Sequence, residues 1–289
     1  MRLVTYREAD GAARVGELAD DGVYPLAAPT MLDWLAGEGR DRTGEEPAPT
    51  SEVTLLAPVP APPSVRDFFA FEGHVAKGFD MRGITVPRAW YDAPVFYFSN
   101  PASIRGPGEP IEKPMSTSVL DFELEIAAVI GAAGEIAGFT LFNDWSARDV
   151  QAVEMTVMLG PHKGKDFATS LGPWIVTPDE LPYEDGRLHL EATASVNGRE
   201  VTRSDAAEQH WPWPALLDHA GRDTRLVPGD VLGSGTLNGG CLLELGPLEG
   251  GRFLEPGDVV TLEAPGLGRL EAQVTRPARP GSADTRPTP

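Results

Sequence analysis

Acidic and apolar side chains alternate through residues 121–126, and a continuous apolar run follows at 127–130. The odd positions are acidic and the even ones apolar: Asp121, Glu123 and Glu125 against Phe122, Leu124 and Ile126. Successive strand residues face opposite ways, so Glu123 and Glu125 would lie side by side, where a cation between them relieves their repulsion. The apolar run 127–130 is typical of a strand that enters a core. The segment is therefore either a buried strand carrying acid toward a cavity or an edge strand with a solvated acidic face.

Residues 1–56 have the pattern of a small N-terminal β-rich domain. Short strand-like runs flank the turn at Asp10-Gly11. Thr30 precedes an i, i+3, i+4 apolar spacing, which predicts a short capped helix over residues 30–36.

Proline content marks the next boundaries. Prolines recur through residues 57–66, which favours an extended linker. The catalytic domain is expected over residues 67–275. Residues 276–289, which are rich in proline and polar side chains, are expected to form a disordered tail.

The main body reads mostly as strands. Asn197-Gly198 between two β-prone runs is a hairpin signal. Helices are expected over about 146–159 and over 214–220. The segment 72–90 contains glycine and has no firm period, and it is expected to be a mobile lid. Strand-like runs lie at 65–70, 93–98, 174–177, 188–196 and 231–232.

Composition narrows the class of protein. The 32 glycines and 28 prolines favour a turn-rich, mostly β fold of the α+β class over a helical bundle. The net charge of −19 argues against a nucleic-acid partner and against docking on an anionic membrane. An anionic substrate would need local cations for its capture. With no apolar run near the roughly 20 residues of a membrane span and no leader-like start, a cytoplasmic location is expected.

Three polar side chains share one stripe of the predicted helix near residue 146. Asp144, Arg148 and Gln151 stand at i, i+4 and i+7. An acid, a planar cation and an amide together could hold a metal and an anionic or carbonyl substrate. The alternative is a surface Asp–Arg pair worth about 0–1 kcal/mol, which the surrounding aromatic residues make less attractive.

Two glycine-rich loops follow. Residues 160–170 place Lys165 among glycines, which lets backbone and ammonium approach a ligand together, although a solvated basic loop is the default reading. Residues 233–241 lack the lysine of a phosphate loop, and no helix obviously opens there. Glu244 beyond them stands alone among apolar neighbours, so it is either an outward-facing strand residue or a buried functional acid.

The histidines and the single cysteine constrain the metal and the chemistry. None of the five histidines has the spacing of a zinc helix, and Cys241 alone excludes an internal disulfide or a thiolate cluster. An oxygen-ligand site for a hard cation is the better expectation. Because a Gly-x-Ser-x-Gly elbow is also absent, activated water is expected rather than a covalent intermediate.

Four segments taken together resemble the fumarylacetoacetate hydrolase family, over roughly residues 67–274. They are Asp121-Phe122-Glu123-Leu124-Glu125, Asn143-Asp144-Trp145-Ser146-Ala147-Arg148-Asp149-Val150-Gln151, Gly164-Lys165-Asp166-Phe167 and Gly235-Thr236. The resemblance implies a mixed β-sandwich or β-roll catalytic domain after a small N-terminal domain, and a homodimer. It also implies a divalent metal, Mg²⁺ or Ca²⁺ with Mn²⁺ as a further candidate, on ligands that match Asp67, Glu123, Glu125 and Asp144.

The resemblance extends to a catalytic pair. In the hydrolase that gives the family its name, a histidine shortly after the first metal aspartate pairs with a late glutamate, and His74 and Glu244 match these positions. Smaller acylpyruvase and decarboxylase members tend to carry a glutamate three residues after their histidine, where this chain has Lys77. This difference favours the hydrolase-type pair.

The activity implied is hydrolysis of a carbon–carbon bond in a 1,3-dicarbonyl or acylpyruvate-like acid. The metal would chelate the substrate and its enolate, and His74, oriented by Glu244, would activate water. Lys165, Arg148 and Gln151 would stabilise negative charge, and Thr236 and Tyr97 would contact substrate.

Two substitutions bear on the substrate. The name-giving enzyme has two tyrosines that hold the distal end of its substrate, and Phe69 and Met155 stand at the matching positions here. The substrate of this protein is therefore expected to carry a more apolar acyl chain. Decarboxylation, isomerisation or hydration of a 2-oxo acid through the same enolate is the alternative reaction. A non-catalytic metal-binding scaffold is the third hypothesis, and the retained lysine argues against it.

Overall fold

The structure, a computed structural model, describes residues 1–8 and 11–277. Its larger sheet has eleven strands, nine of them in the order β3-β2-β1-β13-β11-β10-β18-β5-β6, with β4 paired to β1 and β7 paired to β13. The strands are β1 Arg2–Arg7, β2 Ala13–Ala19, β3 Gly22–Pro25, β4 Thr54–Leu55, β5 Val65–Phe68, β6 Phe96–Ser99, β7 Ile104–Arg105, β10 Leu124–Ile130, β11 Ile136–Asp144, β13 Thr169–Val176 and β18 Val231–Gly233.

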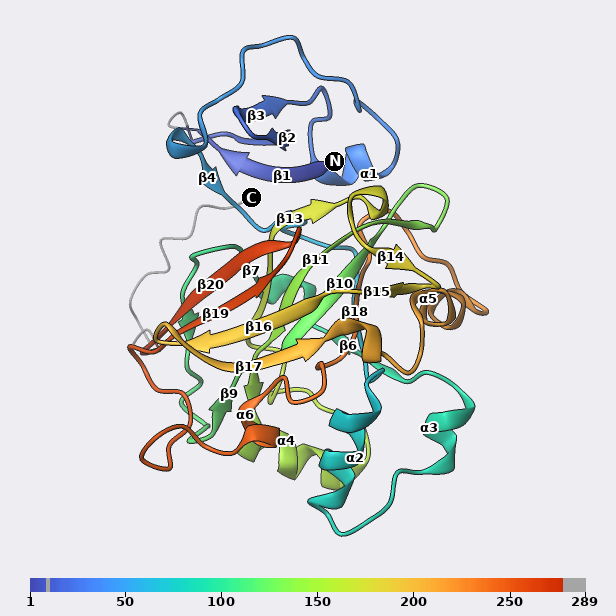
Figure 1. Cartoon of the computed structure of the whole chain (residues 1–289), viewed down its shortest axis with the longest axis vertical. Coiled ribbons are helices and arrows are strands. Elements are labelled where there is room, and N and C mark those ends of the chain that lie inside the picture. Colours follow the sequence, from blue (N-terminus) through green and yellow to red (C-terminus); the bar gives the residue numbers. More distant parts are fainter. Residues whose placement is uncertain (9–10, 278–289) are drawn as a thin grey trace.

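A second sheet of five strands, in the order β17-β16-β19-β20-β8, covers part of the first (Figure 1). These strands are β8 Ile111–Glu112, β16 Glu191–Val196, β17 Arg199–Asp205, β19 Val259–Ala264 and β20 Gly268–Thr275. Two small ribbons complete the β structure: β9 Leu120–Asp121 with β12 Ser146–Ala147, and β14 Tyr183–Glu184 with β15 Arg187–Leu188. The mostly β fold predicted from glycine and proline content is confirmed.

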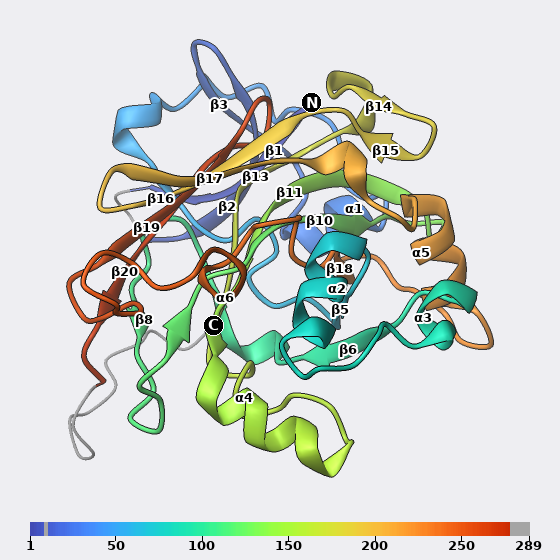
Figure 2. The ribbon, with the colours of Figure 1, turned by 60° about the horizontal axis from the view of Figure 1, so that its bottom comes forward.

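The helices are short: α1 Met31–Leu35, α2 Glu72–Asp80, α3 Arg88–Asp92, α4 Arg148–Glu154, α5 Trp213–Gly221 and α6 Leu242–Leu245. Figure 1 shows α2, α4 and α6 together at one end of the sheets, with the N-terminal strands at the opposite end. Figure 2 brings the helical end forward. Within the described residues, no helix combines the length and the apolar character that a membrane crossing requires.

Strand β10 is buried on both faces. Its even-numbered residues Leu124, Ile126 and Ala128 pack in the core between the two sheets, whereas Ala127 and Val129 pack against the N-terminal part of the chain. The strand lies between β11 and β18, so it has no free edge. This excludes the edge-strand alternative, and the acids at its start are buried.

The N-terminal strands extend the larger sheet. β1 pairs antiparallel with β13, with Leu3 opposite Ile175. Thr30 and Asp33 form a capping box at α1, which confirms the predicted helix start. The boundaries proposed at residues 56 and 66 stay predictions, and the expected tail lies almost wholly outside the described residues.

Three local predictions were correct. The hairpin at Asn197-Gly198 joins β16 and β17. Residues 213–221 form α5. The strand-like run at 231–232 lies in β18.

Three other local predictions were wrong. The segment expected as an aperiodic lid contains α2 and α3, because Phe71, His74 and Val75 bury one face of a helix that glycines obscure in the sequence. The helix expected from residue 146 begins at Arg148, since Ser146 and Ala147 pair with β9. The run 188–196 is interrupted between β15 and β16.

Candidate active site

Four carboxylates converge where β5 and β11 end and β10 begins. Asp67, Glu123, Glu125 and Asp144 each place one oxygen within 4.8 Å of the others, and all four side chains are buried. The pairing of β18 with both β5 and β10 brings Asp67 and Glu125 together, with Gly233 between them. A Cβ at Gly233 would lie 2.4 Å from Asp67 Oδ1, so only glycine leaves room for this carboxylate.

Asp144 reaches this cluster from the last position of β11, where it pairs with Thr169 of β13. Its predicted place on a helical stripe with Arg148 and Gln151 is therefore wrong. The i+4 spacing coincided with a strand end followed by a helix start. Arg148 and Gln151 do share a face of α4, with Arg148 Nη1 donating to Gln151 Oε1 at 3.3 Å.

The carboxylates strongly perturb one another. Burial raises the pKa of the Asp67 carboxyl well above its ordinary value, and repulsion by Asp144 adds to the rise. Burial and the neighbouring Asp67 likewise raise the pKa of Glu125. Burial alone would raise the pKa of Glu123 as well, but Lys165 and Arg148 hold it below its usual range.

These residues fit a hard divalent cation. Among residues 1–8 and 11–277, Asp67 Oδ1 and Asp144 Oδ1 are buried without a hydrogen-bond partner. Such orphaned acceptors are costly unless a cation satisfies them. Ca²⁺ and Mg²⁺ prefer oxygen ligands, and opposite ligands of Ca²⁺ are about 4.6–5.2 Å apart, which suits the 4.8 Å span.

Two cations and a phenol complete the carboxylate cluster. Lys165 Nζ lies 2.5 Å from both Glu123 Oε2 and Asp144 Oδ2. The Tyr97 hydroxyl donates to Asp144 Oδ2 at 2.5 Å. Arg148 Nη1 donates to Glu123 Oε1 at 2.7 Å. Lys165 is thus buried against the acids and is not part of a solvated basic surface, whereas Lys163 in the same loop is exposed.

His74 and Glu244 form a hydrogen-bonded pair at the wall of the same cavity. His74 Nδ1 lies 2.7 Å from Glu244 Oε2, and each side chain is 9 % exposed. Glu244 lies on the one-turn helix α6. It is therefore not on a strand, and a helix does follow the glycine-rich loop, where none was expected. Burial alone would raise the pKa of Glu244, but the hydrogen bond and charge of His74 lower it below its ordinary value.

The backbone around the pair is also fixed. Gly239 donates its N–H to Glu244 Oε1 at 3.0 Å. The side-chain oxygen of Asn238 accepts a hydrogen bond from the backbone N–H of His74 at 3.1 Å, and its NH₂ group donates to Glu208 at 2.6 Å. No local sequence pattern indicates the role of Asn238, because its partners lie far away along the chain.

Asp121 is a second residue whose role the sequence did not reveal. It shares the parity of Glu123 and Glu125 yet lies outside the carboxylate cluster. Its oxygens accept from the backbone N–H groups of Leu242 and Leu243 and from Arg148 Nε. Asp121 therefore ties α6, which carries Glu244, to α4.

A cavity of about 510 Å³ connects the carboxylates with the His–Glu pair. Its lining includes the expected substrate residues Phe69, Tyr97, Met155 and Thr236, together with Gln151. The rest of the wall is largely apolar, and Lys77 and Arg82 add positive charge. Thr236 also donates to Glu125 Oε1 at 3.4 Å. The volume suits a small organic ligand.

Comparison with known proteins bears on the family to which the chain belongs. Residues 64–275 match the model of the fumarylacetoacetate hydrolase C-terminal family. Fumarylacetoacetase of Arabidopsis thaliana is 33 % identical over 282 residues, covering 73 % of this chain and 66 % of that protein, so the chain spans about two-thirds of this relative's length.

Two solved structures share the fold over nearly the whole chain. Fumarylacetoacetate hydrolase from Exiguobacterium antarcticum is 26 % identical with a TM-score of 0.77, covering 96 % of this chain and all of that one. A 5-carboxymethyl-2-hydroxymuconate delta-isomerase from Mycobacterium smegmatis is 28 % identical with a TM-score of 0.72 and the same coverage. With the family match, these similarities show that the chain belongs to the fumarylacetoacetate hydrolase family.

Proposed function

We propose that the protein is a metal-dependent hydrolase that cleaves a carbon–carbon bond in a small 1,3-dicarbonyl or acylpyruvate-like acid. The observation that carries this proposal is the 2.7 Å contact between His74 Nδ1 and Glu244 Oε2 beside the carboxylate cluster. Asp67, Glu123, Glu125 and Asp144 would hold Mg²⁺ or Ca²⁺, which supplies Lewis-acid polarisation of substrate carbonyls when bound.

His74 is the proposed base. The Glu244 carboxylate accepts a hydrogen bond from Nδ1, so the proton resides there and Nε2 keeps its lone pair. Nε2 takes a proton from water, and the resulting hydroxide forms a bond to the carbonyl carbon. Glu244 stabilises the imidazolium that this transfer creates.

Bond cleavage follows from that attack. The carbon–carbon bond beside the attacked carbonyl breaks, and its electron pair leaves with the neighbouring carbon as an enolate. The imidazolium of His74 returns its proton to that carbon, which gives one carboxylic acid and one ketone. Lys165 and Gln151 face the same cavity and would stabilise the developing charge.

Arg148 was expected to stabilise negative charge on the substrate, but we propose a different role for it. Its guanidinium is engaged by Asp121 and Glu123 inside the protein. We therefore propose that it chiefly holds these acids in place. Lys77 and Arg82 at the cavity wall would attract the carboxylate of the substrate against the overall charge of −19.

The substrate is proposed to carry an apolar acyl chain. Phe69 and Met155 line the cavity and offer no hydroxyl to a distal carboxylate. A buried acceptor without its partner costs about 1–3 kcal/mol, or about 5–150-fold in kcat/KM. Hydrocarbon acylpyruvates should therefore be turned over better than fumarylacetoacetate, and a clear preference for fumarylacetoacetate in a substrate panel would contradict this.

Isomerisation, decarboxylation or hydration of a 2-oxo acid is the second candidate. The likeness to a protein named as an isomerase favours it. Because isomerisation consumes no water, it should survive in His74→Ala and Glu244→Gln, whereas hydrolysis should fail in both. We also propose that the protein binds a divalent metal, forms a homodimer and is cytoplasmic. Metal analysis would test the first point and light scattering the second.

A further inference from the structure

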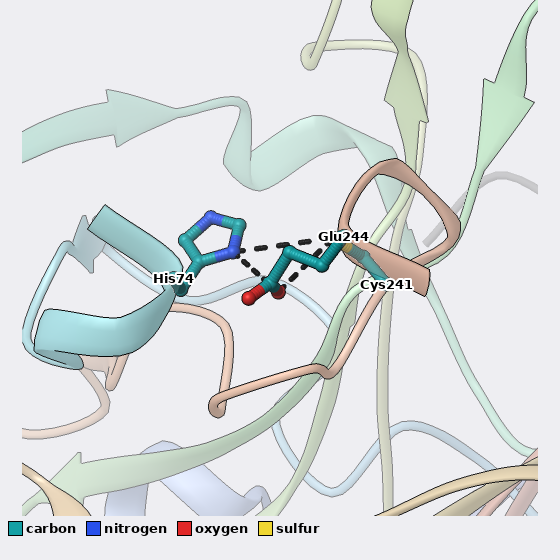
Figure 3. A group of neighbouring side chains, drawn as sticks. All are labelled: His74, Cys241 and Glu244. Carbon is teal, nitrogen blue, oxygen red and sulfur yellow. Dashed lines mark hydrogen bonds and ion pairs between the residues drawn. The ribbon is translucent and has the colours of Figure 1, made fainter. Parts of the chain in front are cut away.

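Cys241 lies against the His74–Glu244 pair, and the proposed reaction makes no use of it. Its Sγ is 3.4 Å from Glu244 Oε2 and 3.9 Å from His74 Nδ1. Figure 3 shows Cys241 and Glu244 coming from one turn of chain and meeting the imidazole that projects from α2. The cysteine is fully buried, whereas His74 and Glu244 line the cavity, so the group is reached from there.

The spacing of these three atoms matches three corners of a tetrahedral zinc site. Zinc bonds of about 2.3 Å to sulfur and 2.0–2.2 Å to nitrogen and oxygen place tetrahedral ligands about 3.3–3.6 Å apart. The two contacts of Sγ lie within about 0.4 Å of that range, and the 2.7 Å contact between Nδ1 and Oε2 needs to widen by about 0.6 Å. Side-chain rotation supplies movements of this size without a change of backbone.

We propose that His74, Cys241 and Glu244 form a site for Zn²⁺, separate from the four-carboxylate cluster. Thiolate and imidazole select zinc, whereas the all-oxygen cluster selects harder cations. Binding would release the proton of the thiol, and the imidazole proton would move from Nδ1 to Nε2, so that Nδ1 can bind the metal while the ring stays neutral. A thiolate, a carboxylate, a neutral imidazole and Zn²⁺ sum to zero charge, so the buried site carries no uncompensated charge.

Zinc at this site would inhibit the enzyme. It would occupy Nδ1 of His74 and the carboxylate of Glu244, which removes the hydrogen bond that orients the base. This consequence rests on the proposed hydrolase function, but the binding of the metal does not. The two are therefore tested by different measurements.

Binding is tested with Co²⁺ as a coloured stand-in for zinc, added to the full-length protein in saturating Mg²⁺. We expect a thiolate-to-cobalt charge-transfer band that excess Zn²⁺ abolishes. Asp67→Ala should keep the band, because it alters only the carboxylate cluster. Cys241→Ala and Cys241→Ser should lose it while they keep the wild-type melting temperature. Absence of the band in wild type, or its persistence in a folded Cys241→Ala protein, would overturn the proposal.

Inhibition is tested by titrating Zn²⁺ during turnover in saturating Mg²⁺. We expect Cys241→Ala to raise the apparent inhibition constant for Zn²⁺ at least about tenfold with little change in Mg²⁺-supported turnover. Equal inhibition of Cys241→Ala and wild type would place the inhibitory zinc elsewhere and overturn the inhibitory role. A protein without hydrolase activity that still shows the cobalt band would contradict the proposed function alone.

Discussion

Replacing Glu244 with glutamine probes the proposed base with a minimal change of shape. Both carboxylate oxygens of Glu244 accept hydrogen bonds, Oε2 from His74 Nδ1 at 2.7 Å and Oε1 from the Gly239 N–H at 3.0 Å. A glutamine must turn its NH₂ toward one of these two donors. If it faces His74, the imidazole keeps its proton on Nε2 and cannot accept one from water.

The expected loss follows from the burial of the pair. Two charges about 4 Å apart at an effective dielectric constant of about 20 attract by about 4 kcal/mol. This attraction exists only after His74 has taken the proton. Since 1.36 kcal/mol corresponds to tenfold, kcat should fall by about 10²–10³ with Mg²⁺ saturating.

The assay is steady-state hydrolysis of an acylpyruvate, with metal content measured on the same samples. Glu249→Gln is a matched control, because the Glu249 side chain is 92 % exposed and its change should leave kcat unaffected. A loss of less than about tenfold in Glu244→Gln, with metal retained, would refute the role of the pair. A parallel loss of metal would show that Glu244 acts through the carboxylate cluster.

Three further predictions concern the metal site. Gly233→Ala should displace the Asp67 carboxylate and lower metal affinity, whereas Gly221→Ala, whose Cβ would meet its nearest neighbour at 3.9 Å, should behave as wild type in metal titrations. Glu125→Ala should lose metal. Asp121→Ala should retain metal and unfold more easily in urea, by up to about 3–5 kcal/mol, because the buried Arg148 keeps only Glu123 as an ionic partner; equal metal loss in the two variants would refute the assignment. Removing metal with EDTA should abolish turnover and lower Tm by about 5–10 °C, if the ion is present at about 100 times its Kd, and an unchanged Tm would count against a structural metal.

Much of the carboxylate cluster was predictable from local pattern. The alternation of acidic and apolar residues placed Glu123 and Glu125 together. The buried strand, one of the two alternatives for this segment, is the one that β10 adopts. The strand structure is interrupted at Phe122 and Glu123, which lie between β9 and β10, although the alternation of residue types continues through them. Parity alone could therefore not separate Asp121 from the other acids. What separates them is the pairing of β9 with β12, a contact that no local pattern encodes.

The errors have a common physical cause. The helical spacing of Asp144 and Arg148 was real in the sequence, but strand pairing of Asp144 with Thr169 overrides it. The helix α2 was missed because its stability comes from burying His74 and Val75 in tertiary contacts and not from its own propensity. The approach of Cys241 to His74 joins residues 167 positions apart, and such long-range contacts depend on the whole fold.

Running the reaction in ¹⁸O-labelled water, with a hydrocarbon acylpyruvate and saturating Mg²⁺, tests the proposed hydrolysis most directly. Activation of water by His74 predicts one labelled oxygen in the newly formed carboxylate, in wild type, and no product above background in His74→Ala. Turnover that gives products without the label in a new carboxylate would contradict hydrolysis and favour an isomerase, decarboxylase or hydratase.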